Sequence, residues 1–139
     1  MKVMLAEEGS EYGQTCANVL RSYGYEATLV PKDGSEVISR LPIHTPDVLL
    51  MDEPFASLDF ITRGELQAEL LDIQKELQKT ILLVTHQLDE ALLLAQRIVV
   101  LHADSSVRVW ELELPYPRDL TSPQLAALRE EITAECRKD

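Results

Sequence analysis

The stretch DVLLMDEP, residues 47–54, decides how the rest of the chain is interpreted. A continuous apolar run lies between Asp47 and Asp52, which is typical of a central parallel strand that is covered on both faces. In open α/β sheets, functional side chains gather at the carboxyl ends of the strands. We therefore expect Asp52 and Glu53 to lie at the functional edge of a sheet.

Short apolar runs on both sides of this segment alternate with helical patterns. Strands are expected at residues 3–6, 27–30, 47–52, 81–85 and 98–101, and helices at 10–23, 33–41, 60–78 and 88–96. This alternation predicts an α/β fold with a three-layer, doubly wound sheet of five mainly parallel strands, in a single domain of residues 1–139. Residues 107–114 predict an additional antiparallel strand, and Ser122-Pro123 predicts the start of a last helix.

The composition argues against several classes of partner. Lys and Arg total 13 against 24 Asp and Glu, so the formal net charge is −11 at pH 7. Binding to nucleic acid or to anionic lipid requires a basic face, so we expect neither. No apolar run approaches the length of a membrane span, and the first residues do not resemble a signal peptide. We expect a cytoplasmic chain with no evident partner, and a homodimer remains open.

The two cysteines, Cys16 and Cys136, are far apart in the sequence and do not form a disulfide framework. Cys16 lies on the apolar face of the helix expected at 10–23, so we expect it in the core. The other apolar positions at helical spacing in this segment are Tyr12, Val19, Leu20 and Tyr23.

Acidic residues follow two of the expected strands. Glu7 and Glu8 come after the first strand, and Asp52 comes at the end of the third. The first and third strands are neighbours in a flavodoxin-like sheet, and clustered carboxylates suit Mg²⁺, beside which a carboxylate can accept a phosphoryl group. Ordinary exposed loop acids would give the same pattern. His86, after the fourth strand, could likewise contact a phosphate or simply pack.

One nucleotide-binding pattern is absent. None of the five glycines is followed by Lys, so the sequence contains no G-x-x-x-x-G-K-[ST] loop. A triphosphate therefore lacks the nest of backbone amides and the lysine that this loop supplies.

From residue 47 onward the chain resembles the ATP-binding subunits of ABC importers of the nitrate, sulfonate and taurine type. The matching stretches are DVLLMDEPFASLD at 47–59, ILLVTHQLDEALLLAQRIVVL at 81–101 and LPYPRDLTSPQLAALREEI at 114–132. The resemblance implies that DVLLMDEP is the Walker B strand, with Asp52 as the Mg²⁺-associated aspartate and Glu53 as the catalytic glutamate. It also implies that Ser57 and Asp59 belong to the nucleotide-site D-loop and that His86 is the switch histidine.

Residues 1–52 resemble the start of a response-regulator receiver domain of the sporulation-regulator type. The resemblance rests on KVMLAEEGSEYGQTCANVLRSYGYEATLVPKDGSEVI and on TPDVLLMD. It implies that Glu7, Glu8 and Asp52 bind Mg²⁺ and that Asp52 is phosphorylated. The lysine that receivers place after the fifth strand is missing, and His102 stands near that position.

The two resemblances meet at residues 47–52, which satisfy both families. We interpret the chain as a recombined or engineered chimera of residues 1–52 and 47–139, in which a receiver-like segment replaces the phosphate-binding half of the importer subunit. The receiver half predicts the strand order 2-1-3-4-5, and the importer half predicts 5-1-4-3-2. We favour 2-1-3-4-5 because residues 1–52 form one continuous receiver-like unit.

Three functions remain open from the sequence. The leading hypothesis is a structural hybrid that requires no cofactor, has no intact catalytic site and is not an enzyme, with the importer-type residues vestigial. The second is a receiver-like switch phosphorylated at Asp52 with the help of Mg²⁺. The third is a residual ATP-binding module of an ABC transporter.

Overall fold

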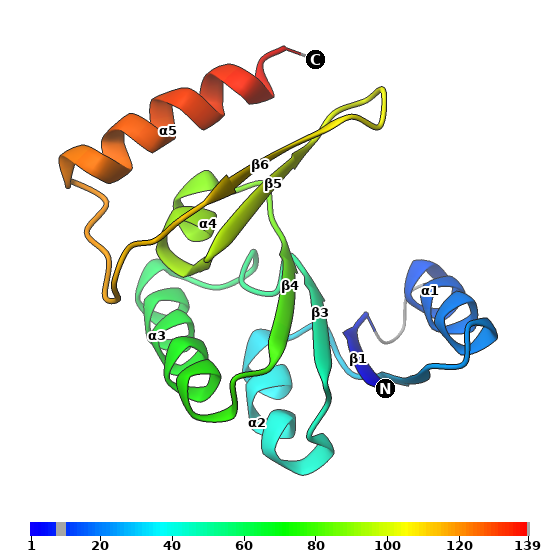
Figure 1. The fold of residues 1–139 in the computed structure, drawn as a ribbon. Helices are drawn as coiled ribbons and strands as arrows, with labels where there is room; N and C mark the ends of the chain where they lie inside the picture. Colours follow the sequence, from blue (N-terminus) through cyan, green and yellow to red (C-terminus); the bar gives the residue numbers. More distant parts are fainter. Residues whose placement is uncertain (8–10, 139) are drawn as a thin grey trace. The chain divides into compact units, whose positions relative to one another are not determined.

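The computed structural model describes residues 1–7 and 11–138, which form two compact units (Figure 1). Unit 1 comprises Met1–Val84 and unit 2 comprises Thr85–Asp139. The sequence predicts one domain with a junction at residues 47–52, whereas the units divide after Val84. Each unit is described by itself below.

Unit 1 is a parallel four-stranded sheet with helices on both faces. Its strands are β1 (Lys2–Ala6), β2 (Glu26–Leu29), β3 (Val48–Asp52) and β4 (Thr80–Val84), in the order β2-β1-β3-β4. Its helices are α1 (Glu11–Ser22), α2 (Gly34–His44) and α3 (Phe60–Leu77), and Figure 1 shows α1 on one face of the sheet and α2 and α3 on the other. These three layers confirm the flavodoxin-like order for four strands. They exclude the order 5-1-4-3-2, because β1 pairs with β3.

Local sequence signals fix where two of these helices begin and end. Asp33 caps α2 by accepting hydrogen bonds from the amides of Ser35 and Glu36, as expected for a capping box position. Asp59 caps α3 in the same way through the amide of Thr62. Both helices end on a residue in the left-handed region, which lets the cap amide donate back to a carbonyl of the last turn.

The structure corrects the expected inner face of α1. Gly13 and Ala17 are the buried residues of this helix, whereas the side chains of Tyr12 and Tyr23 are exposed. Ala17 packs with Val3, Leu5 and Ala27, and Cys16 is only partly buried beside this cluster. Small residues let the backbone of α1 approach the sheet closely. The face of α1 that meets the sheet is therefore the one with Gly13 and Ala17, and the bulky tyrosines point to solvent.

The structure also corrects the position of the fifth strand. In unit 2, β5 (Arg97–Leu101) pairs antiparallel with β6 (Val107–Glu111) in a separate two-stranded sheet. The antiparallel strand expected after residue 106 is therefore present, but its partner does not extend the parallel sheet. A hairpin with a short turn costs little loop-closure entropy, which favours this local pairing. β4 is consequently an edge strand among the described residues, and Leu82 and Val84 are exposed.

The two helices of unit 2 supply the core for the hairpin. These are α4 (Leu88–Leu94) and α5 (Pro123–Cys136), and α5 begins at the Ser122 cap with Pro123 in its first turn, as the sequence predicts. The core of this unit consists of Leu92, Ile98, Trp110, Leu112, Leu125 and Ile132. Within the described residues, no helix is both long enough and apolar enough to cross a membrane.

Candidate functional site

The carboxyl ends of β1 and β3 bring two of the predicted acids to one edge of the sheet. Asp52 is the last residue of β3, and Glu7 follows β1 directly. The parallel register pairs Ala6 with Met51, so the next residue along each strand is Glu7 or Asp52. Glu8, the third predicted acid, lies outside the described residues.

A lysine that the sequence reasoning missed joins these two acids. The Nζ atom of Lys32 lies 3.6 Å from Oε1 of Glu7 and 3.9 Å from Oδ2 of Asp52. The side chain of Glu7 is only 8% exposed, that of Asp52 is 36% exposed, and that of Lys32 is 45% exposed. We call Glu7, Lys32 and Asp52 the strand-end site. It is an ion-paired cluster with one buried and one accessible carboxylate.

The segment that carries Lys32 is held at both ends. Before it, the amide of Val30 donates to the carbonyl of Leu5 at 2.8 Å, and Val30 is fully buried. After it, Asp33 caps α2. Gly34 then lies so close to Phe55 that an added Cβ would be 2.8 Å from the ring. Lys32 therefore extends from a short, anchored loop rather than from a free one.

The turn after Asp52 leads the chain away from the strand-end site. Glu53 has a φ of 48°, in the left-handed region that non-glycine residues rarely adopt, and its amide donates to the carbonyl of Val84 at 2.8 Å. Phe55 is then buried at 1% exposure beside Gly34. This contact joins the receiver-like and importer-like parts of the sequence within one packed unit.

The described residues, 1–7 and 11–138, contain no cluster of three or more His, Cys, Asp or Glu side chains that could ligate a metal ion. At the strand-end site, the ammonium group of Lys32 is in contact with both carboxylates that a cation would need. Mg²⁺ is usually held by one or two carboxylates together with waters and phosphate oxygens, so an ion at this site would compete with Lys32 for the same two carboxylates.

The other importer-type positions are spread over both units. Asp59 caps α3, and the hydrogen bonds from the amide and hydroxyl of Thr62 lower the pKa of its carboxyl group. Ser57 is exposed in the turn that precedes this cap. His86 is exposed and lies in unit 2, ahead of α4. In this structure Asp59 therefore has a local structural role.

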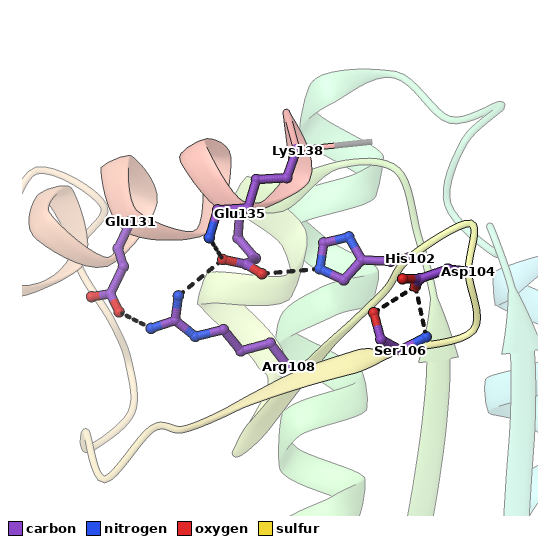
Figure 2. A network of polar contacts seen from close by, with 7 residues as sticks. All are labelled: His102, Asp104, Ser106, Arg108, Glu131, Glu135 and Lys138. Carbon is purple, nitrogen blue, oxygen red and sulfur yellow. Dashed lines mark hydrogen bonds and ion pairs between the residues drawn. The ribbon is translucent and has the colours of Figure 1, made fainter.

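A second polar cluster lies in unit 2, where α5 meets the hairpin (Figure 2). Glu135 accepts hydrogen bonds from Nε2 of His102 at 3.0 Å, from Nη1 of Arg108 at 2.9 Å and from Nζ of Lys138 at 3.0 Å. These bonds, led by those from Lys138 and Arg108, lower the pKa of Glu135 from its ordinary value of 4.5 to about 2. His102, which the sequence places near the receiver lysine position, belongs to this cluster.

The neighbours of this cluster give it a structural role. Arg108 also contacts Glu131 at 3.0 Å, and its guanidinium group lies 4.7 Å from the centre of the Trp110 ring. The indole nitrogen of Trp110 donates to the same Glu131. Both oxygens of Glu135 are occupied and its side chain is 9% exposed, so it is not available to a ligand. We call the contacts of Glu135 the hairpin clamp.

Comparison with curated proteins gives strong similarity to importer subunits over part of the chain. The chain is 43% identical over 101 residues to the aliphatic sulfonates import ATP-binding protein SsuB of Bacillus licheniformis, covering 70% of this chain and 39% of that protein. It is 45% identical over 93 residues to the nitrate import ATP-binding protein NrtD of Synechococcus elongatus, covering 62% and 34%. The chain thus spans about two fifths of the length of the curated relatives it matches.

Comparisons with protein-family models and with solved structures give no match and a weak likeness, respectively. No protein-family model matches the chain. Among solved structures, the signal receiver domain of a modulated diguanylate cyclase from Desulfovibrio desulfuricans superimposes with a TM-score of 0.44 at 21% identity, covering 63% of this chain and 68% of that one.

Proposed function

We propose that this chain is a recombined hybrid whose importer-derived part no longer supports ATP hydrolysis and whose Asp52 acts as a receiver-like phosphoacceptor. The observation that carries this proposal is the strand-end site, where the accessible carboxylate of Asp52 lies 3.9 Å from the ammonium group of Lys32. Glu53, Ser57, Asp59 and His86 are then remnants of the importer site.

The charges at the strand-end site argue against a bound triphosphate. Glu7 stands directly after β1, where a phosphate-binding loop would present backbone amides and a lysine. Asp52 and Glu53 add two further carboxyl groups at the end of β3. The ammonium group of Lys32 contacts Glu7 and Asp52, and one ammonium group cannot offset a triphosphate together with three acids.

The same geometry suits transfer of a single phosphoryl group from a small donor. An oxygen of Asp52 would form a bond to phosphorus in acetyl phosphate while the bond from phosphorus to the acetate oxygen breaks. Acetate leaves with the electron pair, and an acyl phosphate remains on Asp52. The ammonium group of Lys32 is placed to offset the negative charge that approaches and then stays at this position.

The origin of the importer-like part is also a matter for this proposal. The curated relatives are named for the import of aliphatic sulfonates and of nitrate, and this chain matches about two fifths of their length. We propose that it derives from such a subunit without retaining a transport role. We expect the chain to lie in the cytoplasm, where it could act as a monomer or as a homodimer.

Incubation with acetyl phosphate followed by intact-mass measurement tests the phosphoacceptor. The wild-type chain should gain the mass of one phosphoryl group, and Asp52→Asn should gain none. Asp47→Asn is the matched control, because Asp47 precedes the same strand at its amino end and should leave phosphorylation unchanged. Absence of the added mass from the wild type, or its persistence in Asp52→Asn, would overturn the proposal.

A separate assay tests the loss of ATP hydrolysis. The purified chain with ATP and Mg²⁺ should release phosphate at the background rate, and Glu53→Gln should not change that rate. Turnover above background that Glu53→Gln abolishes would show that the importer site still functions.

A further inference from the structure

We infer that Lys32 is the resident cation of the strand-end site and takes the place of a divalent metal, so that the chemistry of Asp52 does not depend on Mg²⁺. The part of this inference that concerns phosphorylation rests on the proposed function. The part that concerns metal binding is independent of it and is tested separately below.

The position of the ammonium group is the first support. Its nitrogen contacts the buried carboxylate of Glu7 and the accessible carboxylate of Asp52 at 3.6 and 3.9 Å. These are the two described acids that the receiver resemblance assigns to Mg²⁺. A metal ion that bridged them would have to displace the ammonium group or accept its repulsion at close range.

The anchoring of Lys32 is the second support. The flexible stem of a lysine normally makes an exposed ion pair weak, because ordering the side chain costs entropy. Here the backbone on either side is held, by the hydrogen bond from the amide of Val30 to Leu5 in β1 and by the Asp33 cap of α2. The contact of Gly34 with Phe55 holds the start of α2 in place as well. The backbone therefore keeps the ammonium group within reach of both acids.

The burial of Glu7 is the third support. A carboxylate at 8% exposure has lost most of its hydration, so a nearby positive charge is worth more to it than to an exposed acid. Asp52, at 36% exposure, keeps one side open to solvent and to a donor. Lys32 thus places a positive charge next to the inner acid and leaves the outer acid accessible.

Binding of Mn²⁺, followed by the paramagnetic signal of the free ion, tests the metal part of the inference. Any Mn²⁺ binding by wild type should be weak, and Lys32→Met should bind with a Kd at least about tenfold lower, because removing one positive charge next to two acids favours a dication. Asp52→Asn in the Lys32→Met background should abolish this gain. Lys75→Met, on the exposed side of α3, changes the net charge equally and should behave as wild type. Wild-type Mn²⁺ binding that Asp52→Asn abolishes and Lys32→Met leaves unchanged would overturn the inference.

Phosphorylation by acetyl phosphate tests the second part. We expect the wild-type rate to change less than about twofold between excess EDTA and millimolar Mg²⁺, and Lys32→Met to be slowed about tenfold in EDTA and restored by Mg²⁺. Lys32→Arg keeps the charge and should remain independent of Mg²⁺. Circular dichroism of each variant shows whether it is folded.

The two assays separate the possible failures. If wild type gains no phosphate in either condition, the phosphoacceptor is refuted, and the Mn²⁺ result alone still decides the role of Lys32. If wild type is phosphorylated with Mg²⁺ and not with EDTA, the phosphoacceptor stands and the resident-cation inference is wrong.

Discussion

Units 1 and 2 each contain a carboxylate that contacts basic side chains, but the two carboxylates differ in how far they are enclosed. In unit 1, Asp52 contacts Lys32 at 3.9 Å and remains 36% exposed. In unit 2, Glu135 accepts from Arg108, Lys138 and the ring of His102 and is 9% exposed. A carboxylate whose oxygens are occupied and enclosed stabilises a fold, whereas one that keeps an open side can react. The number of hydrogen-bond partners and the exposure of the carboxylate distinguish the strand-end site from the hairpin clamp.

The units also differ in how they bury apolar surface. Unit 1 covers a parallel sheet from both faces, with Leu5 and Leu49 fully buried. Unit 2 covers one face of a hairpin, and Val99 and Leu101 on the other face stay exposed. Trp110 is the only tryptophan of the chain and lies in the core of unit 2, so its fluorescence reports on that unit alone.

The largest expected effect comes from truncating one core at a time. Leu125→Ala in unit 2 and Leu49→Ala in unit 1 should each lower the stability of their own unit by about 2–5 kcal/mol, because each leaves a cavity at a fully buried site. Urea unfolding should then show a lower midpoint in Trp110 fluorescence for Leu125→Ala. For Leu49→Ala the loss should appear mainly in circular dichroism. Equal shifts of both signals in both variants would mean that the two cores unfold as one.

The next largest effect is expected where the receiver-like part of unit 1 packs on its importer-like part, at Gly34 and Phe55. Gly34→Ala should destabilise unit 1 by about 1–3 kcal/mol, since its Cβ would meet the buried ring of Phe55 at 2.8 Å. Gly64→Ala is the matched control, because its Cβ meets nothing within 4 Å on the exposed side of α3. It should stabilise the helix by up to about 1 kcal/mol. A neutral Gly34→Ala would show that this contact is loose.

The hairpin clamp should make unit 2 sensitive to acid. The pKa of Glu135 is lower in the folded chain than its ordinary value, so its contribution to stability is complete above pH 4.5 and is lost as the pH falls towards 2. Urea midpoints from Trp110 fluorescence should therefore decline over this range in wild type and decline less in Glu135→Gln. Glu130→Gln, an exposed change on the same helix, should keep the wild-type slope, and parallel slopes in all three proteins would contradict the clamp.

The smallest effect is expected at the exposed pair of the hairpin. Nε of Arg97 lies 2.7 Å from Oε1 of Glu111, with both side chains more than half exposed. Arg97→Ala should change the stability of unit 2 by less than about 1 kcal/mol, because solvent screens such pairs. A thermal-unfolding measurement that shows a loss comparable with Leu125→Ala would contradict this ranking.

The sequence predicts the part of the fold that depends on local pattern. The apolar runs locate the strands, Asp33 and Ser122 mark helix starts, and the receiver resemblance predicts that β1 lies between β2 and β3. Because that order places the ends of β1 and β3 together, the proximity of Glu7 and Asp52 follows from it.

The remaining features depend on tertiary choices that pattern does not settle. The residues 98–101 look like a central strand, yet β5 pairs with its nearest neighbour in the chain. The helical spacing of Tyr12 and Tyr23 predicts an apolar stripe but not whether the sheet meets that stripe or Ala17. Lys32 carries no motif, although a lysine three residues after the end of β2 could have been found once the order β2-β1-β3 was assumed. His102 and Glu135 are 33 residues apart, and no sequence signal joins them.

The proposed function places a single phosphoryl group on one aspartate, Asp52. Treatment with acetyl phosphate, reduction of the acyl phosphate with borohydride and peptide mapping would convert a phosphorylated aspartate into homoserine at its own position. We expect homoserine at position 52 alone, with Asp47 and Asp59 intact. Homoserine at another aspartate, or at none, would contradict it.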